Sequence, residues 1–393
     1  MKLPGALGHL TYCLNTHPAE DWAACRDALT GPVAAVKQAV CPDLTFDVGL
    51  RFSAVALEAL EDPAAREALK SILDAQDYRA LTVNGFPYGP FHGTRVKEDV
   101  YQPDWRTEER LAYTTGLIAL MAEIGPERQP ISLSTVPGTF KPLGAGAEAE
   151  MADRMLRAVA FAVETREDTG RTVALAIEPE PYCFLETIAE SVAFFDKHLF
   201  VEEAVAKIAR WTGLTTGEAA AALPRHLGLC YDVCHAAVEF EDAAGSITAL
   251  RRAEIPVHKL QLSAALRVPS VNAAARDALA AFDEPTYLHQ VVSRRGETLA
   301  YTSDLPEALA SADSDGEEWR IHFHVPIFVD EIPPFSSTQG FLREILALHR
   351  ADPISPHLEV ETYTWGVLPD TLRGNTIEED IARELRWVQD QLV

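Results

Sequence analysis

Residues 172–178, which read TVALAIE, decide the fold together with residues 227–232, which read LGLCYD. In a β-strand, side chains two residues apart share a face. Both segments place bulky side chains on one face and small or polar ones on the other: Val173, Leu175 and Ile177 against Ala174, Ala176 and Glu178, then Leu227, Leu229 and Tyr231 against Gly228, Cys230 and Asp232. Each segment therefore predicts a strand with one hydrophobic face and with an acidic residue at its carboxyl end.

Similar runs recur along the chain, and Ala-rich amphipathic segments separate them. Such alternation is typical of βα units around a parallel sheet. There are nine such runs, one more than an eightfold barrel needs. They lie at 9–15, 44–51, 80–84, 131–135, 172–178, 227–232, 258–263, 320–325 and 357–362. We expect the bulky faces to meet helices and the small or polar faces to point inward.

The sequence therefore predicts a single (β/α)₈ TIM barrel over residues 1–393, with its chemistry at the carboxyl ends of the strands. The competing α/β fold is a doubly wound open sheet, but no GxGxxG follows the first strand and no Walker-type loop is present. An insertion over about residues 264–320 separates the seventh and eighth barrel strands. We expect it to form a lid over the barrel mouth or an arm between copies in a homo-oligomer.

Composition excludes several classes of protein. The 393 residues contain 34 Lys and Arg against 59 Asp and Glu, a net charge of −25, which disfavours binding to nucleic acid or to an anionic membrane. No run reaches the roughly 20 apolar residues of a membrane span, and residues 1–9 lack the features of a signal peptide, so we expect a cytoplasmic protein. Six cysteines without a CxxC pair predict buried thiols.

Acids and histidines gather at four predicted strand ends: Glu178 and Glu180, Asp232 and His235, His322 and His324, and Glu361. Oxygen and nitrogen ligands from several strands suit a divalent cation such as Mg²⁺, Mn²⁺, Co²⁺ or Zn²⁺. The alternative is structural: the two glutamates at strands five and eight would pair with Lys259, Arg51 or Arg95, and each histidine would be an ordinary buried side chain.

This arrangement resembles the xylose isomerase-like TIM barrels, which include sugar isomerases, ketose 3-epimerases and endonuclease IV. The resemblance lies in the strand-end glutamates, the Asp-x-x-His motif and a polar residue in the seventh strand, and it implies the metal ligands Glu178, Asp232, His235, Gln261, His324 and Glu361. Members of the family often carry histidine in the seventh strand, where this chain has Gln261, a weaker ligand. His324 is similar to an additional metal-binding histidine of endonuclease IV, and His322 is the second choice.

The resemblance also implies a reaction: isomerisation or epimerisation of a sugar or sugar-like metabolite through a metal-bound enediolate. Glu178 and Glu361 would then remove and return the proton. Glu180 would support them from the second layer around the metal, or it is an ordinary loop carboxylate. Residues that we expect to bind the substrate are His17, Asn84, Phe86, Tyr88, His92, Lys259 and Trp365, for which ordinary loop packing is the alternative.

A narrower resemblance links the chain to the metabolite-traffic proteins of the ebo gene cluster (the EboE group). It rests on residues 10–18 (LTYCLNTHP), 84–93 (NGFPYGPFHG) and 361–365 (ETYTW). It implies a second hypothesis, a protein that binds or carries a small polar metabolite without turning it over. A third, an endonuclease IV-like phosphodiesterase, needs a cationic groove, and the net charge of −25 counts against it.

Overall fold

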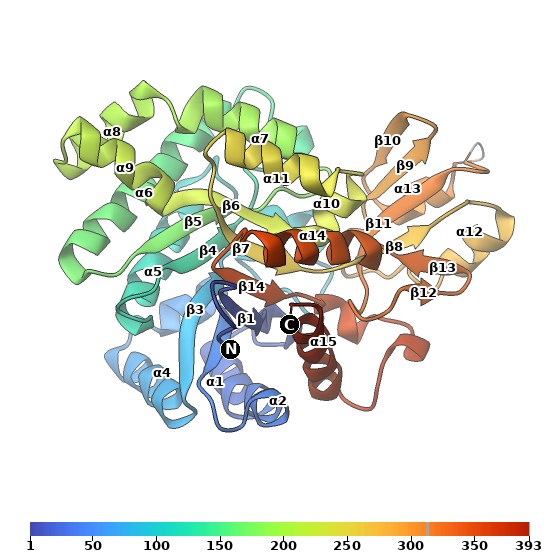
Figure 1. Cartoon of the computed structure of the whole chain (residues 1–393), viewed down its shortest axis with the longest axis horizontal. Coiled ribbons are helices and arrows are strands. Elements are labelled where there is room, and N and C mark those ends of the chain that lie inside the picture. The colour runs from blue at the N-terminus through green and yellow to red at the C-terminus, as the bar shows by residue number, and fades with distance from the viewer. Residues whose placement is uncertain (312–313, 393) are drawn as a thin grey trace.

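The computed structural model describes residues 1–311 and 314–392, and a parallel barrel forms its centre (Figure 1). Eight strands follow the order β1-β14-β7-β6-β5-β4-β3-β2. Their bounds are β1 (His9–Tyr12), β2 (Phe46–Arg51), β3 (Tyr78–Asn84), β4 (Ile131–Thr135), β5 (Val173–Ile177), β6 (Leu227–Asp232), β7 (Val257–Leu262) and β14 (His357–Val360). A parallel bridge between Cys13 and Gly49 joins the two ends of the order. The predicted (β/α)₈ barrel is confirmed.

Gly49 permits this closure because nothing larger fits there. A Cβ atom at Gly49 would lie 1.9 Å from Oε1 of Glu359 and 2.7 Å from the carbonyl oxygen of Tyr12. Real Cβ atoms do not approach other atoms so closely, and backbone oxygen has no room to move. Glycine thus lets β1 and β2 meet around a filled barrel interior.

Helices surround the barrel, as Figure 1 shows. Their bounds are α1 (Trp22–Thr30), α2 (Pro32–Val40), α3 (Ala54–Ala59), α4 (Pro63–Ala75), α5 (Glu108–Ile124), α6 (Glu148–Thr169), α7 (Ile188–Phe194), α8 (Glu202–Thr212), α9 (Thr216–His226), α10 (Val233–Val238), α11 (Ala243–Arg252), α14 (Gln339–Ala351) and α15 (Ile377–Leu392). Short helical turns are η1 (Leu14–Thr16), η2 (Lys97–Tyr101), η3 (Lys141–Leu143), η4 (Phe195–Leu199), η5 (Tyr363–Gly366) and η6 (Asp370–Leu372). Within residues 1–311 and 314–392, no helix is both long and apolar enough to cross a membrane.

The two faces of the barrel strands divide as the alternation predicts. On the outer face, the Tyr231 hydroxyl lies 2.8 Å from Oγ of Ser246 in α11. On the inner face, Ser132 donates a hydrogen bond to Thr82 at 2.8 Å. All six cysteines are free and buried, as expected.

The segment that separates β7 from β14 in the sequence forms a second, antiparallel sheet, which extends to one side of the barrel (Figure 1). Its order is β10-β9-β11-β8-β13-β12, with bounds β8 (Ala265–Val268), β9 (Val291–Arg295), β10 (Thr298–Thr302), β11 (Glu318–His324), β12 (Glu331–Ile332) and β13 (Phe335–Ser337). Two helices accompany it, α12 (Ala273–Leu279) and α13 (Leu305–Leu309). The sheet therefore continues to Ser337, further than the expected end near residue 320.

This sheet accounts for the surplus strand in the sequence pattern. The run at 320–325 belongs to β11, which pairs antiparallel with β8 and β9 and is not a barrel strand. Both faces of β11 are largely buried, so its alternation looks like that of a barrel strand. His324 consequently ends a strand of the inserted sheet.

Candidate metal and substrate site

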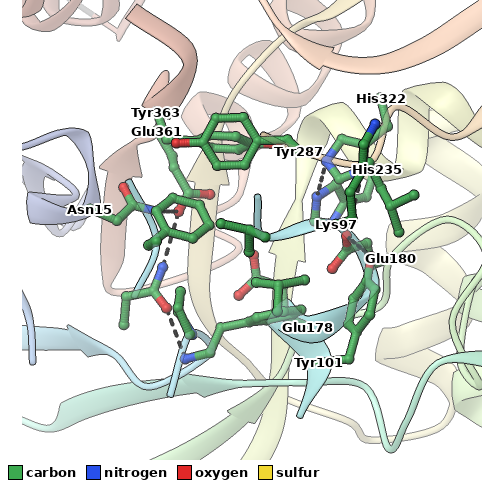
Figure 2. Close-up of a pocket in the computed structure, with 17 residues that line it drawn as sticks. Asn15, Lys97, Tyr101, Glu178, Glu180, His235, Tyr287, His322, Glu361 and Tyr363 are labelled. Atoms are coloured by element: carbon green, nitrogen blue, oxygen red, sulfur yellow. Dashed lines mark hydrogen bonds and ion pairs between the residues drawn. The ribbon is translucent and has the colours of Figure 1, made fainter. Parts of the chain in front are cut away.

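A cavity with about 510 Å³ of free space opens at the carboxyl ends of the barrel strands. Figure 2 shows Asn15 and Glu361 on one side of it, and Glu180, His235 and His322 on the other, with Glu178 between them. The walls come from the barrel, from the segment after β3, from the inserted region and from the segment after β14. The expected position of the site at the strand ends agrees with this cavity.

Three acids form what we call the carboxylate group: Glu178 after β5, Asp232 at the end of β6, and Glu361 after β14. One oxygen from each lies within 4.8 Å of the others, and all three residues are buried. Gln261 in β7 stands in register beside Asp232. In β14 the register partner of Gln261 is Glu359, two residues before Glu361, so the three acids form the group and Gln261 adjoins Asp232.

Asp232 has a local reason for its place. It caps α10, because its Oδ1 accepts a hydrogen bond from the His235 backbone N–H at 3.0 Å, and the Ser263 hydroxyl donates to the same oxygen at 2.7 Å. Its other oxygen, Oδ2, has no hydrogen-bond partner in the described part of the chain. The Asp-x-x-His spacing therefore fixes the carboxylate and leaves one oxygen available.

Glu361 is held from the opposite side. The side-chain amides of Asn15 and Asn84 donate to its Oε1 at 2.6 and 3.0 Å. Across the group, Oε2 of Glu178 and both polar side-chain atoms of Gln261 are buried without a hydrogen-bond partner among the residues described. Buried polar atoms normally have partners, so these atoms are available to bind a cation or water.

The clustered acids would favour a positively charged ligand. Burial, followed by the negative charges of Glu361 and Asp232, raises the pKa of Glu178 well above its usual range. Burial and the charge of Asp232 raise the pKa of Glu361 to about 8. The charge of Lys259 offsets part of this effect for both glutamates, and a divalent cation would offset more of it.

Three histidines form what we call the imidazole group: His235, His322 and His324. The Nδ1 atom of His235 donates to the carbonyl of Pro179 at 2.9 Å, and that of His324 donates to the carbonyl of Glu361 at 2.5 Å. Backbone carbonyls only accept hydrogen bonds, so both rings carry a proton on Nδ1, which leaves Nε2 as the atom that each ring could offer to a metal ion.

The same holds for His322, through Gln290. The Gln290 amide donates to the Pro181 carbonyl at 3.0 Å, which orients its oxygen toward Nδ1 of His322 at 2.8 Å. His322 must therefore donate from Nδ1, and its Nε2 lies 3.1 Å from Nε2 of His235. This contact is favourable when one of the two nitrogens carries a proton or when a metal ion lies beside them.

The imidazole group also offers ligand atoms to a metal ion. Burial, with the neighbouring His235 and His324, holds the pKa of His322 well below its usual range, and burial lowers the pKa of His324 to about 4. Glu180, which accepts a hydrogen bond from Tyr101 at 2.7 Å, completes one possible ligand set with His235 and His322. Asp232, His235 and His324 form another, and Cys234 lies near His322 and His324 as well. Nitrogen and oxygen donors of this kind suit a divalent cation.

The structure brings only part of the predicted substrate-binding set to the cavity. Asn84 and Phe86 line it, together with Glu178, His235 and Glu361 from the predicted catalytic and metal residues. Residues of the set that do not line it are His17, Tyr88, His92, Lys259 and Trp365.

Each of those five side chains has a structural partner or position. Lys259 is fully buried and forms an ion pair with Glu359 inside the barrel, so it is not at the mouth. His92 contacts Glu20 at 3.2 Å, and Nε2 of His17 lies 2.9 Å from the Tyr12 hydroxyl.

The remaining two belong to packing as well. The ring of Tyr88 packs edge-on against Tyr113, with centroids 5.1 Å apart, beside a different surface depression. Trp365 is 1% exposed and lies in the main core. The position of a residue in a loop at the barrel mouth does not predict whether its side chain points into the cavity or packs against the protein.

Sequence reasoning did not propose ten of the residues that line the cavity. They are Asn15, Pro87, Phe91, Val96, Lys97, Val100, Tyr101, Tyr287, Leu288 and Tyr363. Asn15 ends the first predicted strand run, so the rule applied to the other strand ends would have found it. Tyr287 lies in the inserted region, and no pattern in the sequence shows that this segment returns to the cavity. The inserted region therefore contributes part of the cavity wall.

Comparison with known proteins gives the fold but not an activity. No protein-family model and no curated protein matches the chain. Among solved structures, a xylose isomerase-like TIM barrel protein from Mycobacterium smegmatis in complex with magnesium is similar over 98% of this chain and 96% of that one, with 10% identity and a TM-score of 0.52. Two others are the IOLI protein with a zinc atom (13% identity, 98% of both chains, TM-score 0.45) and 3-keto-D-glucoside 4-epimerase from E. coli (12% identity, 99% of both chains, TM-score 0.44).

At identities this low, the comparison shows a common fold and nothing more. The eight parallel strands and the inserted antiparallel sheet already define that fold. The chain therefore has the fold of the xylose isomerase-like TIM barrels.

Proposed function

We propose that the protein is a divalent-metal-dependent isomerase or epimerase that acts on a small hydroxy-carbonyl metabolite of the sugar-like class. The observation that carries the proposal is the carboxylate group: Glu178 and Glu361 approach one point from β5 and β14, with Asp232 between them in the barrel order. Proton transfer next to a carbonyl requires one group that removes a proton and another that returns it.

A cation held by Glu178, Asp232, Gln261 and Glu361, with His235 and His324 nearby, would polarise the substrate carbonyl and offset the negative charge that develops on its oxygen. The free Oε2 of Glu178 accepts the proton from the carbon next to the carbonyl. As that C–H bond breaks, its electron pair forms an enediolate.

Glu361 then returns a proton to the neighbouring carbon in an isomerisation, or to the opposite face of the same carbon in an epimerisation. The amides of Asn15 and Asn84 keep this carboxyl in place. Without a cation, burial and the neighbouring acids raise the pKa of both carboxyls, and a bound cation would lower these pKa values and favour the ionised forms.

The donor atoms narrow the choice of ion. Carboxylate and amide oxygens suit Mg²⁺ or Mn²⁺, whereas the imidazole group with Glu180 suits Zn²⁺ or Co²⁺. We propose that the carboxylate group holds the ion that serves the reaction. The imidazole group provides an adjacent second position.

A second candidate is a metabolite carrier on the same barrel. Gln261 in place of a histidine favours it, because an amide oxygen binds metal more weakly than imidazole does. The resemblance to the ebo metabolite-traffic proteins supports the same alternative. Such a protein would bind its ligand tightly and leave the ligand's C–H bonds intact.

Hydrogen exchange distinguishes these two functions. The Mn²⁺-loaded protein would be incubated in D₂O with a panel of aldoses, ketoses and other hydroxy-carbonyl compounds, and deuterium on carbon would be followed by NMR. An isomerase incorporates deuterium next to the carbonyl of its substrate, and Glu178→Gln and Glu361→Gln abolish the incorporation. Glu67→Gln, which changes an exposed acid on α4, is the matched control. Saturable binding of a compound without exchange would instead support the carrier.

A further inference from the structure

The outer part of the cavity is apolar, although its base is polar. Phe91, Val96 and Val100 come from the segment after β3, Tyr287 and Leu288 from the inserted region, and Tyr363 from the segment after β14. Figure 2 shows the rings of Tyr287 and Tyr363 facing the cavity on the side of Glu361. We call Phe91, Tyr287 and Tyr363 the aromatic wall.

The aromatic wall is a packed cluster of rings. Centroids of Phe91 and Tyr287 lie 5.1 Å apart, those of Phe91 and Tyr363 5.3 Å apart, and those of Tyr287 and Tyr363 5.0 Å apart, in tilted or edge-on arrangements. Such a cluster stabilises itself and forms a concave apolar surface, unlike a single flat ring on which a sugar stacks.

The inserted region holds this wall in place. The backbone N–H groups of Val96 and Lys97 donate to the Thr286 carbonyl at 2.8 and 2.9 Å, next to Tyr287. The Lys97 ammonium also pairs with Asp304 of the same region at 2.7 Å. The wall is therefore part of the folded structure, shared between the barrel loop and the insertion.

Several polar groups along the cavity already have partners: Lys97 pairs with Asp304, the Tyr101 hydroxyl donates to Glu180 at 2.7 Å, and the amides of Asn15 and Asn84 donate to Glu361. Among the described residues, the buried lining atoms without a partner are Oε2 of Glu178 and Oδ1 of Asn15, at the polar base. A polyhydroxylated chain beside Phe91, Val96 and Leu288 would lose hydration without gaining equivalent hydrogen bonds, which is unfavourable.

We propose that the substrate is amphipathic: a hydroxy-carbonyl head at the carboxylate group, joined to an aryl or branched alkyl group that the aromatic wall surrounds. The hydroxy-carbonyl head of this substrate rests on the proposed function. Its apolar substituent is inferred from the apolar residues that line the outer part of the cavity. The substrate is then a hydroxy-carbonyl compound with an apolar substituent, and not a free sugar.

Hydroxamates test this inference, because they resemble an enediolate and carry a variable substituent. Three probes share that head: acetohydroxamate, 3-phenylpropionohydroxamate and 2,3,4-trihydroxybutyrohydroxamate. Calorimetry on the Mn²⁺-loaded full chain is expected to show the phenyl compound binding about tenfold or more tighter than acetohydroxamate, since burying a phenyl group stabilises by that order. The trihydroxy compound is expected to bind no tighter than acetohydroxamate.

Two variants locate the effect. Tyr287→Ala and Tyr363→Ala are expected to reduce the preference for the phenyl compound over acetohydroxamate about fivefold or more. Tyr287→Ala is expected to leave the affinity for acetohydroxamate unchanged, which also shows that this variant folds. Because the ring of Tyr363 packs against His324, with centroids 4.6 Å apart, Tyr363→Ala is judged only by the ratio of the two affinities. Tyr301→Ala, an exposed tyrosine of β10, is the matched control.

The outcomes separate the two proposals. Tighter binding of the trihydroxy compound than of the phenyl compound, or a phenyl preference that both tyrosine variants retain, would overturn the amphipathic substrate while leaving the metal-dependent function intact. Failure of all three probes to bind in a Mn²⁺-dependent way would contradict the proposed function itself, and the substrate inference with it.

Discussion

Nε2 of His235 and Nε2 of His322 face each other at 3.1 Å, and each ring donates from Nδ1 to an oxygen acceptor on its far side. A neutral pair in these tautomers brings two lone pairs together. The arrangement is favourable when one nitrogen is protonated or when a cation lies beside the two nitrogens, and Glu180 is an acid close enough to share such a cation. The same two nitrogens are the atoms that a divalent cation would use as ligands.

Cobalt substitution tests the role of these histidines. We expect the wild-type protein with Co²⁺ to show visible d–d absorption typical of a low-coordinate site with nitrogen ligands, because imidazole and carboxylate donors converge there. His322→Gln should weaken Co²⁺ binding about tenfold to a hundredfold. His198→Gln, which changes a histidine that contacts Glu148, should leave the spectrum unchanged. An unchanged spectrum in His322→Gln would contradict the assignment.

Removing an acid from the carboxylate group should stabilise the metal-free protein. Glu178→Gln relieves the burial of one of several like charges, and we expect the free energy of unfolding to rise by about 1 to 2 kcal/mol. The same variant should lose the stabilisation that Mn²⁺ provides, which is about 2.7 kcal/mol at a concentration 100 times Kd. Denaturant unfolding with EDTA and with Mn²⁺ measures both. Lower stability combined with a retained Mn²⁺ effect would argue against the site.

Lys259 is expected to be structural. Lys259→Met leaves Glu359 buried without its ion-pair partner, and should destabilise the fold by about 3 to 5 kcal/mol. Replacing both residues, with Lys259→Met and Glu359→Leu, should recover most of that loss. Urea unfolding of the single and double variants measures the coupling. Additive effects of the two substitutions would show that the pair does not act as a unit.

Glu20 connects the loop of Phe91 to the barrel and gives a pH-dependent contribution. Burial acts to raise its pKa, but the hydrogen bond from His92 and the charge of Arg51 outweigh this and lower the pKa from 4.5 to about 2. A carboxyl with a lowered pKa in the folded state stabilises the fold fully above its unfolded pKa and loses that contribution as the pH falls.

The corresponding variant is Glu20→Gln. We expect it to lower the free energy of unfolding by about 1 to 2 kcal/mol above pH 5, a value reduced for the partial exposure of the side chain. The difference from wild type should shrink between pH 4.5 and pH 2. Parallel unfolding curves at several pH values check this, and a difference that grows toward low pH would contradict the role of the ionised carboxylate.

Alternation in the sequence predicted the barrel because it depends only on which side of each strand meets helices. For the same reason it placed Glu178, Asp232 and Glu361 correctly at strand ends. It could not separate β11 from a barrel strand, since a strand buried on both faces in any sheet shows the same pattern.

Loop residues were harder to predict because neighbours in a loop turn in opposite directions. Phe86 lines the cavity, whereas Tyr88, two residues later, packs on Tyr113. The aromatic wall depends on contacts between residues almost 200 positions apart, such as Phe91 with Tyr287. No local pattern encodes such contacts.

Metal analysis tests the central claim most directly. Protein purified without chelator, as wild type, Glu178→Gln and Glu361→Gln, would be analysed for bound metal and then titrated with Mn²⁺ and Zn²⁺. We predict about one or more divalent ions per chain in the wild type, with a loss of the ion at the carboxylate group in both variants. A wild-type protein that contains no metal and has no affinity for either ion would contradict a metal-dependent isomerase.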